Sequence, residues 1–151
     1  IVNVGNNDLG ATKAYRAAER SKTLSSERLK YAVISMSPVS VTTGYDDVVS
    51  PEVLFPDESG ISTIVLPEDQ RVEIHLNSAD STVTNWKGGS FLFNGNARRL
   101  PLGSFMDTRN GIFYWQPGPP HFGEFLFAFA QKNTNGELVK KLVRIIIVSK
   151  F

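Results

Sequence analysis

The stretch that decides the fold is residues 111–129, with the sequence GIFYWQPGPPHFGEFLFAF. Apolar and aromatic residues alternate on both sides of a central Pro/Gly segment, and such alternation is typical of a strand with one buried face. Pro117, Pro119 and Pro120 cannot continue a strand ladder, because proline lacks the N–H group and has a fixed φ. The chain must therefore leave one sheet at this corner and enter another, which predicts a β-sandwich.

Short strands separated by turns are predicted throughout residues 31–151. The segments with strand character are 31–36, 39–43, 62–66, 71–76, 91–93, 106–115, 124–131 and 138–149. Within 71–76 the three apolar residues face inward, and Arg71, Glu73 and His75 face outward. Trp115 is expected in the core. This spacing of strands and turns favours an all-β fold, an antiparallel sandwich of the immunoglobulin-like (Ig-like) kind.

Three Asn-Gly pairs and the final strand add detail to this fold, and the first pair, Asn94-Gly95, is predicted to end the strand at residues 91–93. Asn110-Gly111 predicts a type I′ hairpin turn, since both central residues of that turn need a positive φ. Asn135-Gly136 predicts the turn into the last strand, residues 138–149. That strand is apolar on both faces, with Arg144 as an exception. It is therefore expected to be either central in its sheet or covered by a partner.

Residues 1–30 differ from the rest and are interpreted as an N-terminal arm. They carry six Lys and Arg residues against three Asp and Glu residues, a net charge of +3. Alanine, lysine, arginine and glutamate favour a helix, but the apolar face is thin, so the arm is expected to be partly helical or extended. Two interpretations stay open. The arm is a solvated linker, or it docks on a neighbouring subunit through Lys13, Tyr15, Arg16 and Arg20.

Composition limits the classes of partner. The 151 residues carry a net charge of +1, which gives no overall field to attract nucleic acid. Cysteine is absent, which excludes disulfides and thiolate metal sites. No apolar run reaches the roughly 20 residues that a transmembrane helix needs. The chain begins at Ile1 rather than Met, so we expect a chain that was either processed or excised from a longer one.

Several motifs between residues 60 and 150 occur together in one known class of module. They are RVEIHL (71–76), RRLPLGS (98–104), Asp107 with Gly111, FYWQPGP (113–119), GEF (123–125), Phe129 and the closing strand 143–148. With these motifs the segment resembles the Ig-like, cadherin-like modules of bacterial surface and secreted proteins. The resemblance implies a seven-stranded sandwich, placed outside the cell or on its surface, that acts as a spacer, an adhesive module or a carbohydrate-binding module.

One position departs from that family. Such modules often place a tyrosine after the glycine at the corner, and its hydroxyl bonds back to the backbone. This chain has Phe125 there, so the packing role is expected to remain while the hydroxyl clamp is lost.

The residues that could support chemistry are scattered. His75 and His121 have no helically spaced partners and no cysteine beside them, whereas tetrahedral zinc needs three or four convergent ligands. Calcium stays open as an alternative through the acidic residues, but the Asp-x-Asn-Asp and Asp-x-Asp motifs are missing. Asp107 is expected to cap the loop before Asn110. No nucleophile elbow, phosphate loop or paired carboxylate motif occurs, so the chain is not expected to be an enzyme or to hold a cofactor.

Trp86 is the aromatic residue with the strongest indication of exposure. The segment Asn85-Trp86-Lys87-Gly88-Gly89 indicates a surface loop, and an exposed indole could stack on a sugar or anchor a partner. The alternative is an indole folded over the edge of the sandwich.

We therefore expect a non-catalytic, extracellular structural or adhesive module. It would be a subunit of a cell-surface assembly or filament, held by its N-terminal arm and edge strands through contacts with other protein subunits. The alternative function is a carbohydrate-binding module that uses Trp86.

Overall fold

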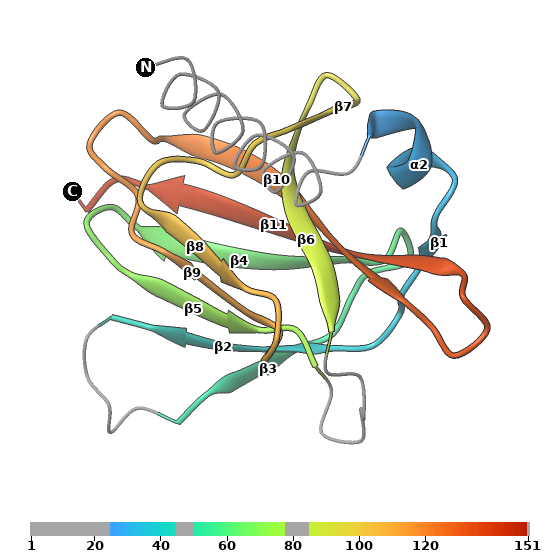
Figure 1. Cartoon of the computed structure of the whole chain (residues 1–151). Coiled ribbons are helices and arrows are strands. Elements are labelled where there is room, and N and C mark those ends of the chain that lie inside the picture. The colour runs from blue at the N-terminus through green and yellow to red at the C-terminus, as the bar shows by residue number, and fades with distance from the viewer. Residues whose placement is uncertain (1–24, 45–49, 78–84, 151) are drawn as a thin grey trace, which may run out of the picture.

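The structure is a computed structural model that describes residues 25–44, 50–77 and 85–150. These residues form two β-sheets packed face to face, with one short helix beside them (Figure 1). The first sheet contains β1 (Val33–Ile34), β4 (Ile61–Pro67), β6 (Trp86–Phe93), β7 (Asn96–Arg98), β10 (Gly123–Lys132) and β11 (Leu138–Val148). The second contains β2 (Val39–Thr43), β3 (Glu52–Leu54), β5 (Val72–His75), β8 (Ser104–Asp107) and β9 (Ile112–Trp115). We call them the six-stranded and the five-stranded sheet.

The corner predicted from the Pro/Gly segment is confirmed. β9 belongs to the five-stranded sheet and β10 to the six-stranded sheet, and residues 117–120 carry the chain between them. A turn forms there, in which the N–H of His121 donates to the carbonyl oxygen of Gly118 at 3.0 Å. The His121 ring lies 5.4 Å from the Trp115 ring in an edge-to-face arrangement, so the histidine packs in the corner.

Alternating side chains from both sheets meet in one aromatic core. Trp115, Phe113, Phe127 and Phe129 are fully buried, as the alternation predicts for Trp115 and for the two β10 residues. Phe125 is partly buried, and its ring lies 5.3 Å from that of Trp115. The packing role expected at the tyrosine position is thus kept without a hydroxyl.

The final strand is central, which settles one open alternative. β11 pairs antiparallel with β10 on one side, and on the other it pairs with β1 and β4. Both of those pairings are parallel, so the prediction of a purely antiparallel sandwich is wrong for this edge. The sandwich character is confirmed, and the two sheets are antiparallel elsewhere. Because β11 is covered on both flanks by strands of its own chain, its apolar character does not by itself require a partner.

The prediction of a type I′ turn at Asn110-Gly111 is wrong. Asp107 pairs with Ile112, which leaves a four-residue loop, and only Gly111 has a positive φ of 69°. Oδ1 of Asp107 accepts the backbone N–H groups of Arg109 and Asn110, both at 3.1 Å, so this carboxylate caps the loop as expected and sets its length. The two-residue turn with both φ values positive lies instead at Asn94-Gly95, between β6 and β7.

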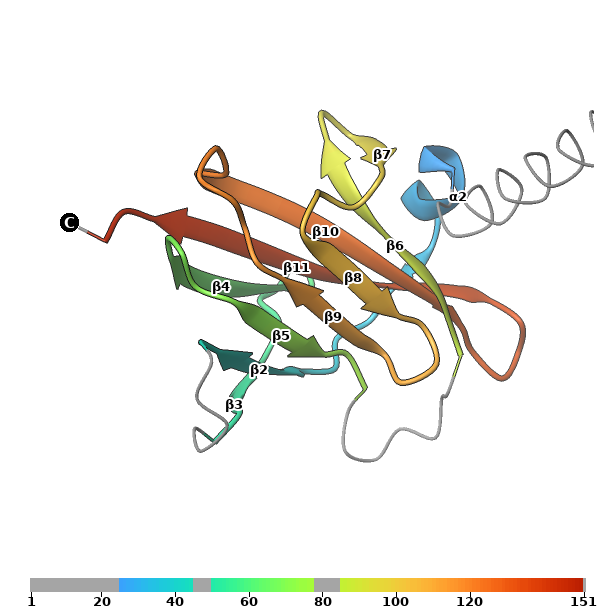
Figure 2. The ribbon, with the colours of Figure 1, turned by 60° about the vertical axis from the view of Figure 1, so that its left-hand side comes forward.

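Residues 26–30 of the predicted arm pack against the six-stranded sheet as helix α2 (Ser26–Lys30), which lies beside β7 and β6 (Figure 2). Ser25 caps the helix, and Leu29 is buried against Ala128, Ala130 and Leu142. The Ser26 hydroxyl accepts the backbone N–H of Ala97 at 2.7 Å. Residues 1–24, and with them Lys13, Tyr15, Arg16 and Arg20, lie outside the described residues.

Candidate interaction surfaces

The prediction of an exposed Trp86 is wrong. Trp86 begins β6, and its side chain is only 4% exposed within the core. Its Nε1 donates to Oδ1 of Asn77 at 2.9 Å, which satisfies the one polar atom of the indole. The glycines after Trp86 misled the sequence interpretation, because they belong to the strand. Gly89 in particular lies directly opposite Phe129, where a larger side chain would meet the ring. A buried indole offers almost no surface for stacking.

One side of the sandwich, formed by edge strands, carries a concentration of exposed hydrophobic side chains. β1 and β4 lie at the edge of the six-stranded sheet, and β3 lies at the edge of the five-stranded sheet. Of the twelve exposed large hydrophobic residues in the described part of the chain, six belong to these strands or follow them within two residues: Val33, Ile34, Met36, Val53, Phe55 and Val65. Such gathering of exposed apolar side chains marks interaction sites on soluble proteins. We call these six residues, with β4 itself, the edge surface.

A groove of about 370 Å³ opens between the two sheets at this edge. Its apolar lining comes from Val41, Leu54, Ile64 and Val65, and Glu52 adds a carboxylate. The groove lies next to β4, which pairs with β11 alone among the described strands. The flank of β4 that faces away from β11 therefore has no described strand beside it, and it borders this groove.

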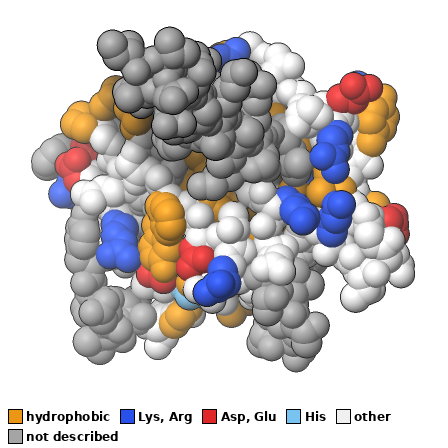
Figure 3. Space-filling view, in the orientation of Figure 1, with side chains coloured by type: hydrophobic (Ala, Val, Ile, Leu, Met, Phe, Trp, Pro, Cys, Tyr) orange, Lys and Arg blue, Asp and Glu red, His pale blue; other side chains and the backbone are white. Residues whose placement is uncertain are grey.

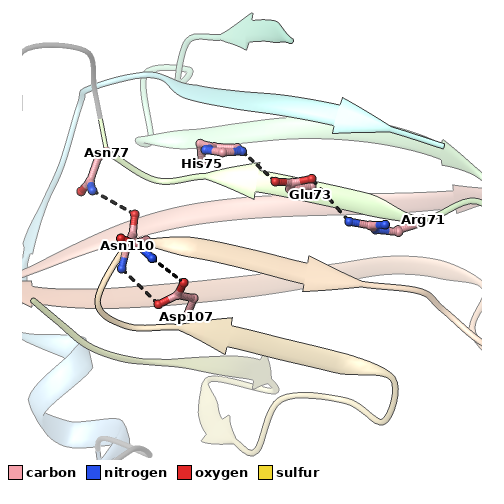
Figure 4. A network of polar contacts seen from close by, with 6 residues as sticks. All are labelled: Arg71, Glu73, His75, Asn77, Asp107 and Asn110. Atoms are coloured by element: carbon pink, nitrogen blue, oxygen red, sulfur yellow. Dashed lines mark hydrogen bonds and ion pairs between the residues drawn. The ribbon is translucent and has the colours of Figure 1, made fainter. Parts of the chain in front are cut away.

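The outer face of the five-stranded sheet carries a different, mixed population of side chains. Figure 3 shows hydrophobic, basic and acidic groups gathered over β5, β8 and β9. His75, predicted to face outward, does so, and its Nε2 is hydrogen-bonded to Oε1 of Glu73 at 3.0 Å. The other carboxylate oxygen of Glu73 lies 3.5 Å from a guanidinium nitrogen of Arg71. Figure 4 shows these three side chains in a line along β5.

A second series of side-chain hydrogen bonds runs from the core to the loop between β8 and β9. Asn77 receives the Trp86 indole N–H and donates its own amide to the carbonyl oxygen of Asn110 at 3.2 Å. The Asn110 amide in turn donates to Oδ2 of Asp107 at 2.8 Å (Figure 4). This amide, followed by the backbone N–H of Asn110, lowers the pKa of Asp107. Asp107 thus acts as a loop cap, which agrees with its predicted structural role.

Phe105 and Tyr114 complete the outer face, and sequence reasoning did not single them out. They lie opposite each other on β8 and β9, and their ring centroids are 6.2 Å apart. The signal was present in the sequence, because inward-facing Phe113 and Trp115 require Tyr114 to face outward. Desolvation, and then the Glu73 and Asp107 carboxylates, raise the pKa of the Tyr114 hydroxyl, which therefore stays protonated at neutral pH.

In the described part of the chain, no three His, Asp or Glu side chains gather as a metal ion would need. Among the acidic residues of the chain, Asp57 accepts two backbone N–H groups in its own turn, and Asp46, Asp47 and Asp80 lie outside the described residues. Among the described helices, none is both long and apolar enough to cross a bilayer.

Neither a protein-family model nor any curated protein matches this chain.

Proposed function

We propose that the chain is a non-catalytic structural module that assembles with other copies of itself through the edge surface. The observation that carries the proposal is that, among the described residues, an unpaired strand edge coincides with half of the exposed large hydrophobic side chains. The mechanism is contact between subunits, in which backbone pairing gives affinity and apolar side chains give specificity.

β4 is unusually open to such pairing. Its sequence, ISTIVLP, contains no charged residue, and its only proline is the last residue. Proteins normally protect an edge strand with charges, proline or bulges, because exposed ladder groups recruit other strands. A second β4 strand can approach without like-charge repulsion, and its ladder groups can satisfy those of the first strand.

The groove beside β4 supplies the second half of the contact. Val41 and Ile64 are core residues that reach the surface there, and Leu54 and Val65 extend the apolar lining outward. A side chain from the neighbouring subunit that enters the groove removes this apolar area from water, which is favourable at about 25 cal/mol per Å². Thr43, Ser50, Glu52 and Thr63 supply the polar half of the lining, so a groove of mixed character next to a strand edge favours an extended segment with alternating side chains over a helix.

The placement of this module outside the cell or on its surface, and an adhesive role there, form part of the same proposal. They rest on the resemblance of residues 60–150 to Ig-like, cadherin-like surface modules. The arm contributes Lys13, Tyr15, Arg16 and Arg20 as proposed contacts with a neighbouring subunit.

Light scattering of the whole chain over a wide concentration range tests the assembly. We expect masses above that of a monomer, and we expect Val65→Lys to abolish them, because it places a charge on the β4 edge. Leu102→Lys is the matched control: Leu102 is 89% exposed, and it precedes β8 at the far edge of the five-stranded sheet. A wild-type monomer at every concentration, or equal masses for both variants, would contradict the proposal.

The arm is tested separately with a chain that begins at Ser25. A deletion through residue 29 would also remove buried Leu29 and its contacts with the sheet, whereas a start at Ser25 keeps helix α2 and its cap. If the arm docks on a neighbour, the shorter chain loses mass or affinity. Unchanged assembly of the shorter chain would make the arm a linker.

A further inference from the structure

The outer face of the five-stranded sheet arranges four side chains in one row. Strand pairing places Phe105 opposite Tyr114, Tyr114 opposite Glu73, and Glu73 opposite Thr42. The row crosses four neighbouring strands, β8, β9, β5 and β2, and spans about 14 Å at the usual strand separation. It is aromatic at one end and polar at the other. A ligand that lies across the strands would meet both kinds of surface at once.

The aromatic end is an accessible platform. Phe105 is 64% exposed, and the two ring planes of Phe105 and Tyr114 differ by only 30°. The two rings are neighbours, with centroids 6.2 Å apart, and together they gather aromatic surface at this end of the row. The guanidinium of Arg71 lies over the Tyr114 ring, 5.7 Å from its centroid, and brings hydrogen-bond donors to the tyrosine side of this aromatic pair.

The polar end is held in place before any ligand arrives. Glu73 is fixed from two sides, by His75 and by Arg71. Its carboxylate is an acceptor, the Arg71 guanidinium is a donor, and the Tyr114 hydroxyl can serve as either. Side chains that are already ordered lose less conformational entropy on binding, which favours affinity. The row thus combines a flat apolar surface with orientated donors and acceptors within reach of it.

An aromatic surface beside fixed hydrogen-bond donors and acceptors indicates which kind of ligand the face can bind. A pyranose ring has an apolar face of C–H groups and a rim of hydroxyls that both donate and accept hydrogen bonds. The C–H face can stack on the exposed Phe105 ring, and the hydroxyls on the rim can hydrogen-bond to Glu73 and Arg71. The face carries the carboxylates of Glu73 and Asp107 as well as the guanidinium of Arg71, so a charged ligand of either sign would meet a like charge, which favours a neutral ligand.

We propose that the outer face of the five-stranded sheet binds a neutral saccharide, whose ring stacks on the exposed Phe105 ring beside Tyr114 and whose hydroxyls bond to Glu73 and Arg71. This site goes beyond the assembly function, because it lies on a sheet face and uses none of the edge-surface residues. It also replaces Trp86 as the aromatic group for sugar binding. The saccharide site and the assembly surface are independent, so the failure of one leaves the other standing.

An array of neutral and acidic oligosaccharides, followed by titration calorimetry with the strongest neutral binder, tests the site in the whole chain. We expect neutral oligosaccharides to bind. Phe105→Ala should weaken the affinity by about tenfold, since it removes one stacking ring. Glu73→Gln should weaken it as well, because the amide presents one acceptor oxygen where the carboxylate presents two. Phe93→Ala is the control, because it removes another exposed ring from the opposite sheet.

The proposal is overturned if no neutral oligosaccharide binds, or if Phe105→Ala binds as tightly as the wild type. It is also overturned if Phe93→Ala loses as much affinity as Phe105→Ala. Val65→Lys should bind the sugar normally, which separates this site from assembly. Because Phe105 is largely exposed, its truncation leaves the core intact, and circular dichroism should confirm an unchanged fold.

Discussion

The Nζ atom of Lys141, on β11, donates a hydrogen bond to the backbone carbonyl oxygen of Leu76, the residue that follows β5. The same Nζ donates to the carbonyl oxygen of Pro38 at 3.0 Å, just before β2. A single ammonium therefore connects the six-stranded sheet to two segments of the five-stranded sheet. Lys141 is only 3% exposed, and desolvation lowers its pKa from 10.5 to about 8.

This buried amine predicts a specific pH dependence of stability. Between pH 8 and 10.5 the unfolded chain holds a proton on Lys141 that the folded chain has released, so stability rises with pH in this window. The full rise attributable to Lys141 is about 3 kcal/mol, because one pKa unit corresponds to about 1.4 kcal/mol. Urea unfolding of the wild type and of Lys141→Met at a series of pH values measures it. Parallel curves for the two proteins would refute the depressed pKa.

The contact between Gly89 and Phe129 predicts a cost for any added side chain. A Cβ at Gly89 would lie 2.7 Å and 2.8 Å from two carbons of the buried Phe129 ring. Gly89→Ala should therefore lower the free energy of unfolding by about 1–3 kcal/mol through overpacking. The double variant with Phe129→Leu should cost less than the sum of the two single changes, since the smaller side chain makes room. Additive costs in this cycle would show that the ring is not what excludes the methyl group.

Much of the fold could be predicted because it depends on local signals. Alternation of apolar residues identified β5, β9 and β10, and the prolines after Trp115 identified the change of sheet. The parallel pairing of β1 and β4 with β11 could not be predicted in this way. Pairing partners far apart in sequence leave no periodic signal, and an apolar strand fits both parallel and antiparallel neighbours.

The candidate surfaces were harder to predict, because they depend on which residues the pairing brings together. The row from Phe105 to Thr42 depends on how four strands pair, because the pairing register alone places these residues opposite one another. Trp86 was assigned to a loop because glycines follow it, although those glycines let Phe129 pack closely against the strand. Lys141 is separated from inward-facing Val143 and Ile145 by two and four residues, so it lies on the same face of β11. This spacing was a usable signal for a buried amine.

The burial of Trp86 predicts a structural cost that an exposed residue would not have. Trp86→Ala should lower the free energy of unfolding by about 3–5 kcal/mol, because it leaves a large cavity in the core and removes the donor to Asn77. Urea unfolding followed by far-UV circular dichroism measures the change without relying on tryptophan fluorescence. A cost below about 0.5 kcal/mol would be typical of a surface position and would support the exposed loop instead.

The docking of helix α2 predicts that residues at the end of the arm stabilise the sandwich. Leu29 is buried against Ala128, Ala130 and Leu142, and the ammonium of Lys140 donates to the carbonyl oxygen of Leu29 at 2.8 Å. Leu29→Ala should lower the free energy of unfolding by about 2–3 kcal/mol, since it removes most of the apolar contact. It should also speed amide exchange at Ala97, because this N–H donates to the Ser26 hydroxyl only while the helix is docked.

Arg28→Ala is the matched control, because Arg28 lies on the exposed side of the same short helix. It should change the stability by less than about 0.5 kcal/mol and leave exchange at Ala97 as in the wild type. Equal effects of the two substitutions would mean that the helix stabilises the chain through its own formation. An effect of Leu29→Ala alone would show that the contact between the helix and the sheet supplies the stability, because only this variant changes the packed face.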